Sequence, residues 1–251
     1  MFGLEDETMM GIWALIAGCV MVTLLFIPAP YGRHASKAWG KGYDSRWSFF
    51  FMEIPAFLIM GIRFLLSEHK TAVSTVFCLL FELHYFRRTF IYPFTLKGSA
   101  TYPIAVSLMA IVFNFCNGYF LTQYLTGANV ESYPVTWLVS PQFLIGLCLF
   151  LGGMAGNRWA DHVMANLRKP GETGYKIPYG GLFRWISCPN YACEMVEWLG
   201  FCLLTCTPPA WVFLAWTIAN LAPRAVSHHK WYKATFPEYP KNRKAFIPYL
   251  L

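Results

Sequence analysis

The sequence predicts an all-α, polytopic integral membrane protein that crosses the bilayer seven times, with its N-terminus outside and its C-terminus in the cytoplasm. Three observations carry this prediction. The 251 residues are 56% hydrophobic and only 13% charged, about half the charged fraction of a typical soluble domain. The hydrophobic residues form runs long enough to span a membrane, and the basic residues lie between the runs. The lipid bilayer is therefore the first partner that the sequence indicates.

A membrane span needs roughly 20 mostly apolar residues. The first five expected spans cover residues 9–27, 47–66, 71–90, 102–125 and 142–157. The last part of the chain is harder to divide, because residues 198–223 are uncharged but contain two prolines at 208–209. Two further spans fit if the first of them begins near Tyr191 and includes Glu194 and Glu197.

The basic residues decide between six and seven crossings, because Lys and Arg favour the cytoplasmic side. With seven spans and an outside N-terminus, 18 of the 20 Lys and Arg residues lie inside, and only Arg63 and Lys70 lie outside. Six spans would place the basic residues from Arg224 onward on the wrong side. The composition changes nowhere along the chain and no segment repeats, so residues 1–251 are expected to form a single domain.

Other protein classes fit the sequence less well. The net charge of +7 would suit a nucleic-acid-binding protein, but the basic residues form no groove-reading helix, so we expect no nucleic acid as a partner. Six of the eight cysteines lie inside apolar stretches and none is in a Cys-x-x-Cys pair, which indicates small buried side chains. His228 and His229 are neighbours whose rings diverge, so we expect no metal site.

Glu53 stands among apolar residues in the second expected span, in the stretch FFFMEIPAF. An ionisable group at the bilayer centre costs about 2.5 to 3.5 kcal/mol on insertion scales, so each one marks a candidate functional site. Burial favours the neutral, protonated carboxyl, which can donate a hydrogen bond. The alternative is a carboxylate paired with Arg63 or with a base of another span.

Polar side chains recur at helical spacing in four further stretches near the expected inner face. Steps of three and four residues place such side chains on one face of a helix. A polar stripe in lipid must face the protein interior, although tyrosine and arginine also anchor helices at the membrane interface. The stripes are Glu82, Tyr85, Arg88 or Thr89, and Tyr92; Asn157 and Asp161; Asn190, Glu194 and Glu197; and Arg224, His228 and Tyr232.

Together these groups suit a large polar cofactor. Carboxylates and amides can bind hydroxyl and carboxamide groups, guanidinium groups can bind phosphates, and a phenol can stack or donate. The sequence contains neither a complete glycine-rich dinucleotide fingerprint nor a GxxxxGK[ST] motif, and the glycines within 152–156 indicate close helix packing instead. On the residues alone, a transporter fits as well as an enzyme.

Four long segments carry motifs that can be compared with known families. They are LHYFRRTFIY (83–92), LRKPGETGYKIPYGGLF (167–183), PNYACEMVEW (189–198) and RAVSHHKWYKATFPEYPKNRKAFIPYLL (224–251). In this order they resemble the steroid 5-alpha-reductase family. The shorter PYGRHA (30–35) and the Glu-x-Pro that begins at Glu53 are also similar to that family. The likeness covers nearly the whole chain and is strongest after Asn157.

The resemblance implies an enzyme that uses NADPH to reduce the 4,5 double bond of a 3-oxo-4-ene steroid. It implies that Glu53 and Tyr85 are catalytic and hydrogen-bond the 3-oxo group, with Glu53 either protonated or acting through the Tyr85 hydroxyl. Donors at such an oxygen stabilise the developing charge by roughly 3 to 4 kcal/mol each in other oxyanion sites. The first four spans would form the substrate chamber, and spans five to seven with the cytoplasmic loops would hold NADPH.

The family's cofactor-binding positions carry over residue by residue, with Arg168 and Arg224 as the phosphate candidates. The implied set is Arg88, Tyr92, Lys97, Asn157, Asp161, Arg168, Tyr175, Asn190, Glu194, Arg224, His228 and Tyr232.

Two departures from the family pattern leave details open. Met52 precedes the glutamate where animal members carry glutamine, which removes one polar contact. The stretch after Tyr92, PFTLKGSATYP, lacks the Asn-Arg pair of animal members, so Lys97 either replaces a phosphate contact or that contact is absent. The resemblance assigns no proton donor to carbon 4 of the steroid.

Related membrane proteins are the alternatives. Sterol or enoyl reductases and isoprenylcysteine-type methyltransferases share the C-terminal architecture, but a methyltransferase would bind S-adenosylmethionine and need no pair of Glu53 and Tyr85. A lipid or ion transporter would use the buried acids as a relay. Other flat enones would also fit an apolar chamber. The host determines the membrane, which is the plasma membrane in a bacterium and the endoplasmic reticulum in a eukaryote.

Overall fold

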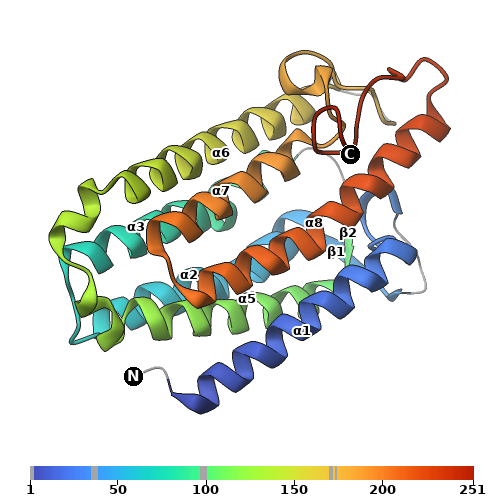
Figure 1. Ribbon diagram of the computed structural model, residues 1–251. Helices are drawn as coiled ribbons and strands as arrows, with labels where there is room; N and C mark the ends of the chain where they lie inside the picture. The colour runs from blue at the N-terminus through green and yellow to red at the C-terminus, as the bar shows by residue number, and fades with distance from the viewer. Residues whose placement is uncertain (1–2, 35–38, 97–100, 170–171, 173) are drawn as a thin grey trace. The chain divides into compact units, whose positions relative to one another are not determined.

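The computed structural model describes residues 3–34, 39–96, 101–169, 172 and 174–251, which are mostly helical (Figure 1). Contacts divide the chain into two compact units, each assembled from segments distant in sequence. The first unit contains Met1–Trp13, Ala29–Leu144 and Thr207–Phe213, and the second contains Ala14–Pro28, Ile145–Cys206 and Leu214–Leu251. The long helices are α1 (Leu4–Phe26), α2 (Ser45–Leu66), α3 (Ala72–Phe86), α5 (Ile104–Leu125), α6 (Pro141–Ala165), α7 (Pro189–Thr205) and α8 (Pro208–Thr235).

Within the described residues, four helices are long and apolar enough to cross a membrane, namely α1, α2, α5 and α6. The helices α3 and α7 have 15 and 17 residues, slightly fewer than the roughly 20 that one span requires. The helix α8 has 28 residues, but its second half carries charged side chains. The helical class is confirmed and the four apolar helices indicate a membrane protein, while seven crossings and the orientation stay predictions.

Two helices extend further than the apolar pattern suggested. The helix α6 continues from the expected end at Asn157 to Ala165, so Asn157 and Asp161 share one regular helix. The helix α8 continues through Pro223 to Thr235. The predicted break before Pro208 is confirmed, because α7 ends at Thr205 and α8 begins at that proline. Proline is tolerated there because the first helical amide has no partner within its own helix.

In the first unit, α2 packs against both α3 and α5 (Figure 1). A short antiparallel pair, β1 (Gly42–Asp44) and β2 (Thr101–Pro103), ties the starts of α2 and α5 together, because each strand leads directly into one of these helices. Asp44 also caps α2 by accepting a hydrogen bond from the backbone amide of Arg46 at 2.8 Å. The strand pair thus fixes the starts of α2 and α5 relative to each other.

The third expected span, residues 71–90, is not one regular helix. The helix α3 begins at a capping box formed by Thr71 and Ser74 and is followed by a π-helical turn, η3 (Arg87–Ile91), and the short α4 (Tyr92–Thr95). A π-helical turn adds a residue to the turn and rotates the side chains that follow. The turn therefore shifts Arg88 and Tyr92 in register relative to Glu82, although Glu82 and Arg88 both contact α2.

In the second unit, α6 and α7 lie side by side and approach closely at glycines (Figure 1). A Cβ placed on Gly153 would lie 2.4 Å from the backbone nitrogen of Glu197, and one on Gly200 would lie 2.4 Å from that of Phe150. Side chains essentially never occupy such positions, so these contacts require glycine. Close packing at 153 agrees with the sequence prediction, whereas Gly152 faces open space.

We therefore expect Gly153→Ala to destabilise the protein by about 1–3 kcal/mol, the usual cost of overpacking. The added methyl group meets the backbone of α7, which cannot move aside as a flexible side chain would. Thermal unfolding in detergent measures the effect. Gly152→Ala is the matched control on the adjacent residue and should keep or raise the midpoint, because alanine favours a helix more than glycine does and has open space there. Equal midpoints for both variants would contradict this account of the helix contact.

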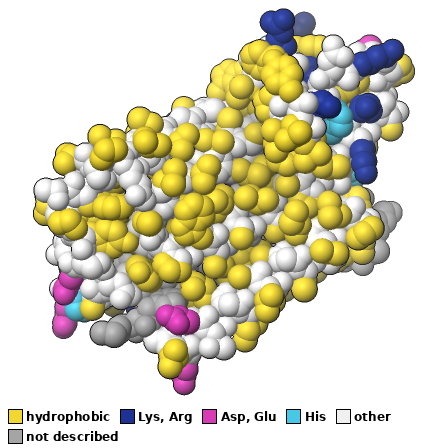
Figure 2. Space-filling model, in the orientation of Figure 1, with side chains coloured by type: hydrophobic (Ala, Val, Ile, Leu, Met, Phe, Trp, Pro, Cys, Tyr) yellow, Lys and Arg dark blue, Asp and Glu magenta, His cyan; other side chains and the backbone are white. Residues whose placement is uncertain are grey.

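The second unit also contains the C-terminal segment, which pairs with the residues before α7. Ile186 and Lys244 form a parallel bridge, and the amide of Cys188 donates to the carbonyl of Ala245 at 3.0 Å. On the face shown in Figure 2, Lys and Arg side chains gather around this end of the second unit, while hydrophobic side chains cover most of its helices. This division of polar and apolar surface is typical of a protein embedded in lipid.

Candidate functional site

A buried hydrogen-bonded cluster surrounds Glu53 in the first unit. The Glu53 residue is only 9% exposed, and its Oε1 accepts hydrogen bonds from Arg88 Nη2 at 2.8 Å and Arg88 Nε at 3.2 Å. This is the ion-paired alternative of the sequence prediction, with Arg88 rather than Arg63 as the base. The Arg63 side chain bonds to Gln123 instead. Removing one partner from a buried ion pair typically costs 3–5 kcal/mol, so the two charges depend on each other.

Asn114 of α5 joins this carboxylate to Tyr85. It is 4% exposed, and its Nδ2 donates to the carbonyl of Met52 at 2.6 Å and to Glu53 Oε2 at 3.3 Å. Its Oδ1 accepts a hydrogen bond from the Tyr85 hydroxyl at 3.2 Å. The amide thus fixes both residues that the resemblance names as catalytic. The Tyr85 hydroxyl is a neutral donor, whereas the paired Glu53 is an acceptor.

Aromatic rings complete the environment of Arg88. Its guanidinium carbon lies 4.9 Å from the centre of the Tyr92 ring and 5.4 Å from that of Phe49. Cation–π contacts of this kind hold the guanidinium plane in one orientation. The structure therefore places Arg88 and Tyr92, which were expected to bind cofactor, around Glu53. Glu82 lies elsewhere, with its carboxylate against Gly61 of α2.

In the second unit, Asn157 joins α6 to the start of α7. It is 3% exposed, and its Nδ2 donates to the carbonyl of Asn190 at 3.0 Å and to Glu194 Oε2 at 3.2 Å. The two sequence stripes on α6 and α7 therefore meet, as their spacing predicted. The Glu194 carboxylate and the Asn157 amide together offer both acceptors and donors to a carboxamide or a hydroxyl group.

Tyr191 organises the cationic residues of α8. Its hydroxyl accepts a hydrogen bond from Arg224 Nη2 at 2.7 Å and lies 3.3 Å from His228 Nε2. The Arg224 guanidinium lies over the Tyr191 ring, 4.9 Å from its centre. The predicted stripe of Arg224 and His228 thus contacts α7 through a residue next to Asn190. A guanidinium and an imidazole beside one another can bind an anionic group such as a phosphate.

The remaining predicted residues lie in different surroundings. Arg168 is exposed in the connection between α6 and α7, where its Nη1 donates to the carbonyl of Gly174 at 3.5 Å. Tyr175 meets the edge of Trp231 with ring centres 5.0 Å apart. Tyr232 is buried and stacks on Tyr239 with ring centres 5.2 Å apart. Asp161 is half-buried one helical turn beyond Asn157. The residue Lys97 lies outside the described residues.

A second polar cluster anchors the C-terminal segment to the residue two positions before α7. Ser187 Oγ lies 2.6 Å from both His229 Nδ1 and the Tyr239 hydroxyl. Arg243, 2% exposed, donates to the Tyr239 hydroxyl at 3.5 Å. Burial raises the pKa of Tyr239, so its hydroxyl stays protonated near neutral pH. His228 and His229 have different partners, as their adjacency predicted. This cluster holds the segment that precedes Asn190 and Glu194.

The charge state of His229 predicts a pH dependence of stability. Burial first, and then the cations Lys233, Arg243 and Lys244, lower the pKa of His229 in the folded protein. The unfolded chain therefore binds a proton more readily than the folded protein. The stability that depends on neutral His229 is fully present above about pH 6.5, the ordinary pKa of histidine, and is lost as the pH falls towards the lower pKa of the folded state.

We expect the thermal midpoint to decrease between about pH 7.5 and about pH 5.5, and to decrease less in His229→Gln, which cannot take up the proton. Thermal unfolding across this range measures both. His162→Gln, at an exposed histidine of α6, is the control and should follow the wild type. An unchanged pH profile in His229→Gln would show that another group causes the loss.

Comparison with known proteins assigns the chain to a family. The family described as 3-oxo-5-alpha-steroid 4-dehydrogenase matches residues 100–251. The chain is 39% identical over 235 residues to 3-oxo-5-alpha-steroid 4-dehydrogenase 1 of Bos taurus, covering 92% of this chain and 91% of the relative. The chain belongs to the 3-oxo-5-alpha-steroid 4-dehydrogenase family. It is also similar to the Homo sapiens protein of the same name, with 40% identity over 224 residues, 88% of this chain and 85% of the relative.

A plant relative extends the family likeness. Steroid 5-alpha-reductase DET2 of Gossypium hirsutum is 38% identical over 242 residues, covering 94% of this chain and 93% of its own length. Coverage of that extent includes the polar residues around Glu53 and those around Asn157. The resemblance found in the sequence is therefore confirmed at the level of the steroid dehydrogenase family.

Two residues of this dehydrogenase family member escaped the sequence analysis. Asn114 and Tyr191 carry no charge, so the insertion cost that marks ionisable groups did not single them out. A signal existed for Asn114, because it is one of two asparagines in the otherwise apolar middle of α5. Tyr191 lies inside the PNYACEMVEW motif, between residues that had been selected.

Proposed function

We propose that this protein is a membrane-embedded reductase that uses NADPH to reduce the 4,5 double bond of 3-oxo-4-ene steroids. Membership in the 3-oxo-5-alpha-steroid 4-dehydrogenase family favours this activity over a methyltransferase or a transporter. The observation that carries the proposal is the buried set of Tyr85, Asn114 and Glu53 in apolar helices. A neutral donor in such surroundings suits an enone oxygen that becomes negative during reduction.

The proposed role of Tyr85 is to donate a hydrogen bond to the 3-oxo oxygen. We give this role to Tyr85 because the contacts with Arg88 favour the carboxylate form of Glu53, which has no proton to donate. Glu53 then acts through Asn114, whose Oδ1 accepts the Tyr85 hydroxyl hydrogen in the free protein and would release it to the 3-oxo oxygen when the steroid binds. The low dielectric of the site strengthens a hydrogen bond to the growing negative charge.

The donor set of the second unit fits NADPH. Arg224 and His228 would bind phosphate oxygens, and Asn157, Asn190 and Glu194 would bind the carboxamide and a ribose hydroxyl. Arg168 is a further phosphate candidate, because it is exposed and uses one of its donors on a long backbone contact. When bound, NADPH supplies the hydride that the reduction consumes. The proton added at carbon 4 has no assigned donor among these residues.

The proposed topology has seven crossings, an outside N-terminus and a cytoplasmic C-terminus. It is supported by the positions of 18 of the 20 basic residues, since Lys and Arg favour the cytoplasmic side. Under this topology the cationic residues of α8 and of the α6–α7 connection lie on the side where NADPH is found. The apolar steroid would enter from the bilayer.

The purified protein should oxidise NADPH only when a 3-oxo-4-ene steroid is present. Loss of absorbance by NADPH measures the rate, and mass analysis of the steroid shows a gain of two hydrogens. A saturated 3-oxo steroid is the matched control, because it offers the same ketone without the double bond. Failure to turn over any 3-oxo-4-ene steroid would refute the proposed reaction.

A further inference from the structure

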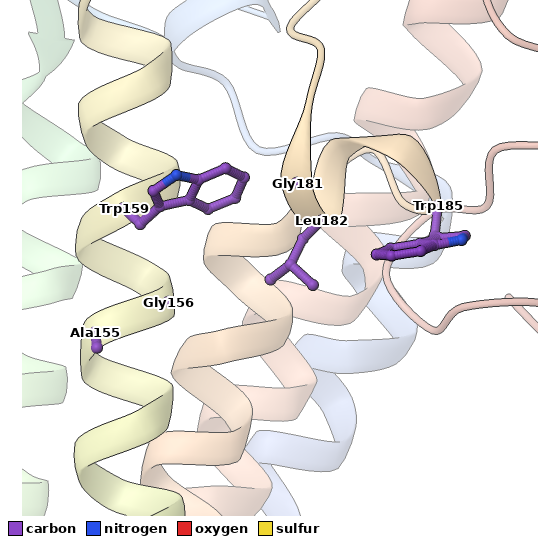
Figure 3. A pocket seen from close by; sticks show the side chains of 6 residues that line it. All are labelled: Ala155, Gly156, Trp159, Gly181, Leu182 and Trp185. Atoms are coloured by element: carbon purple, nitrogen blue, oxygen red, sulfur yellow. The ribbon is translucent and has the colours of Figure 1, made fainter.

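An apolar groove of about 410 Å³ lies in the second unit between α6 and the short helix η6 (Gly181–Arg184). Figure 3 shows it with Trp159 on one side, Trp185 on the other and Leu182 between them. None of its residues belongs to the polar clusters assigned above. The groove is lined by Ala155, Gly156, Trp159, Gly181, Leu182 and Trp185.

One wall of the groove is held in place by packing. The Trp159 ring lies directly on Gly181, where an added Cβ would be 2.4 Å from the ring, and its centre lies 5.7 Å from that of Phe183. Gly181 has a φ of +45°, a backbone conformation that favours glycine. The floor is formed by Ala155, which has only a methyl group, and by Gly156, where an added Cβ would lie 2.6 Å from Cys193 Sγ of α7.

An exposed apolar stripe on α6 leads into the groove from the membrane. It contains Ile145, Cys148 and Leu151 and continues to Ala155 at helical steps of three and four residues. Ten residues of α-helix span about 15 Å, which is half of the roughly 30 Å hydrocarbon core. The stripe and groove therefore have the length of one lipid leaflet.

Each of the two tryptophans that line the groove has an arginine as its neighbour in the sequence. Arg184 is exposed, with its guanidinium carbon 5.9 Å from the centre of the Trp185 ring. Arg158, also exposed, directly precedes Trp159. Glu172, in the connection between α6 and α7, is held by Lys176 and does not offset them. Tryptophan is typical of the level of lipid headgroups, and arginine there attracts anionic lipids.

We propose that this groove binds one anionic phospholipid, with an acyl chain between Trp159 and Trp185 and the phosphate beside Arg184. The apolar lining alone would accept any hydrocarbon, and the cationic rim selects the anionic headgroup. On α6, Ala155 and Trp159 lie on the face away from Asn157. Lipid bound there would steady η6 and hence the Ser187 segment, without entering the proposed cofactor site.

Native mass spectrometry of the purified full-length protein tests the proposal. Phosphatidylglycerol and phosphatidylcholine with identical acyl chains are added separately, and retained lipid is counted. One phosphatidylglycerol should be retained per chain, in preference to phosphatidylcholine. Arg184→Gln should weaken its binding about fivefold, as expected for one arginine near a headgroup. Ala155→Phe should abolish retention by filling the groove. Lys241→Gln, at an exposed lysine of the same unit, is the control and should bind like the wild type.

Four outcomes would overturn the proposal. Equal retention of both lipids would show that no residue selects the anionic headgroup. Normal retention in both Arg184→Gln and Ala155→Phe would show that the lipid binds elsewhere. Competition by glycerol 3-phosphate would show a site for free phosphate instead. A wild-type dimer that Ala155→Phe converts to monomer would show that a second copy of the chain covers the groove. Each result is independent of steroid reduction.

Discussion

We expect Tyr85→Phe to lower kcat for steroid reduction by about 10²–10³-fold, the loss seen when one oxyanion donor is removed from other enzymes. The substitution removes the phenol oxygen and keeps the ring, whose centre lies 4.6 Å from that of Phe81. The lost hydrogen bond would act on charge that develops during the reaction, so kcat and kcat/KM should fall together. Steady-state rates of NADPH oxidation measure both.

Tyr119→Phe is the matched control for this prediction. Tyr119 also lies in the first unit, and its hydroxyl donates to Asp6 at 3.3 Å, outside the Glu53 cluster. The control should keep its rate, and Tyr85→Phe should still be protected from heat by NADPH. A kcat for Tyr85→Phe close to that of the wild type would show that Tyr85 is not the hydrogen-bond donor to the 3-oxo oxygen.

Glu53→Gln distinguishes an ion-paired Glu53 carboxylate from a protonated carboxyl, the two states that the sequence left open. If the carboxylate is ion-paired, the variant leaves the Arg88 charge without its partner, so both kcat and the thermal midpoint should fall. If the carboxyl were protonated, the amide would keep a neutral donor, and stability would change little. The contacts of Arg88 favour the first result.

The order of the helices could be predicted from the sequence because a membrane restricts the chain so strongly. Backbone groups in lipid must bond within their own helix, so long apolar runs become helices. The break between α7 and α8 followed from Pro208 for a similarly local reason. The π-helical turn at Arg87–Ile91 could not be predicted in this way. It depends on one hydrogen bond register rather than on composition, and it decides where Arg88 points.

The partners of the site residues were harder to predict than the residues themselves. The cost of burial marked Glu53 but gave no information on which base lies nearby. Arg63 was the named candidate, yet it lies further along the same helix and bonds to Gln123. Arg88 reaches Glu53 only because α3 and its π-helical turn pack beside α2. Asn114 was missed because an uncharged amide costs less to bury than a carboxylate.

We expect Arg224→Ala to weaken NADPH binding by about 10- to 100-fold, because a hydrogen bond to a charged group contributes about 1.5–3 kcal/mol. Its guanidinium already lies against the Tyr191 ring, bonded to that hydroxyl at 2.7 Å. Little side-chain freedom would therefore be lost when a phosphate binds. The dissociation constant, measured by the quenching of protein fluorescence, gives the effect apart from turnover.

Comparison with NADH would show which phosphate of NADPH Arg224 is proposed to bind. NADH lacks the 2′-phosphate, so loss of a contact there would weaken NADPH alone, whereas loss of a pyrophosphate contact would weaken both nucleotides equally. Lys230→Gln removes an exposed cation from the same helix and controls for general charge. Tyr191→Phe keeps the Arg224 charge but removes its hydrogen bond, and it should cost less than Arg224→Ala. Unchanged affinity for NADPH in Arg224→Ala would exclude a phosphate role, because the loss of a charge-assisted hydrogen bond weakens binding measurably.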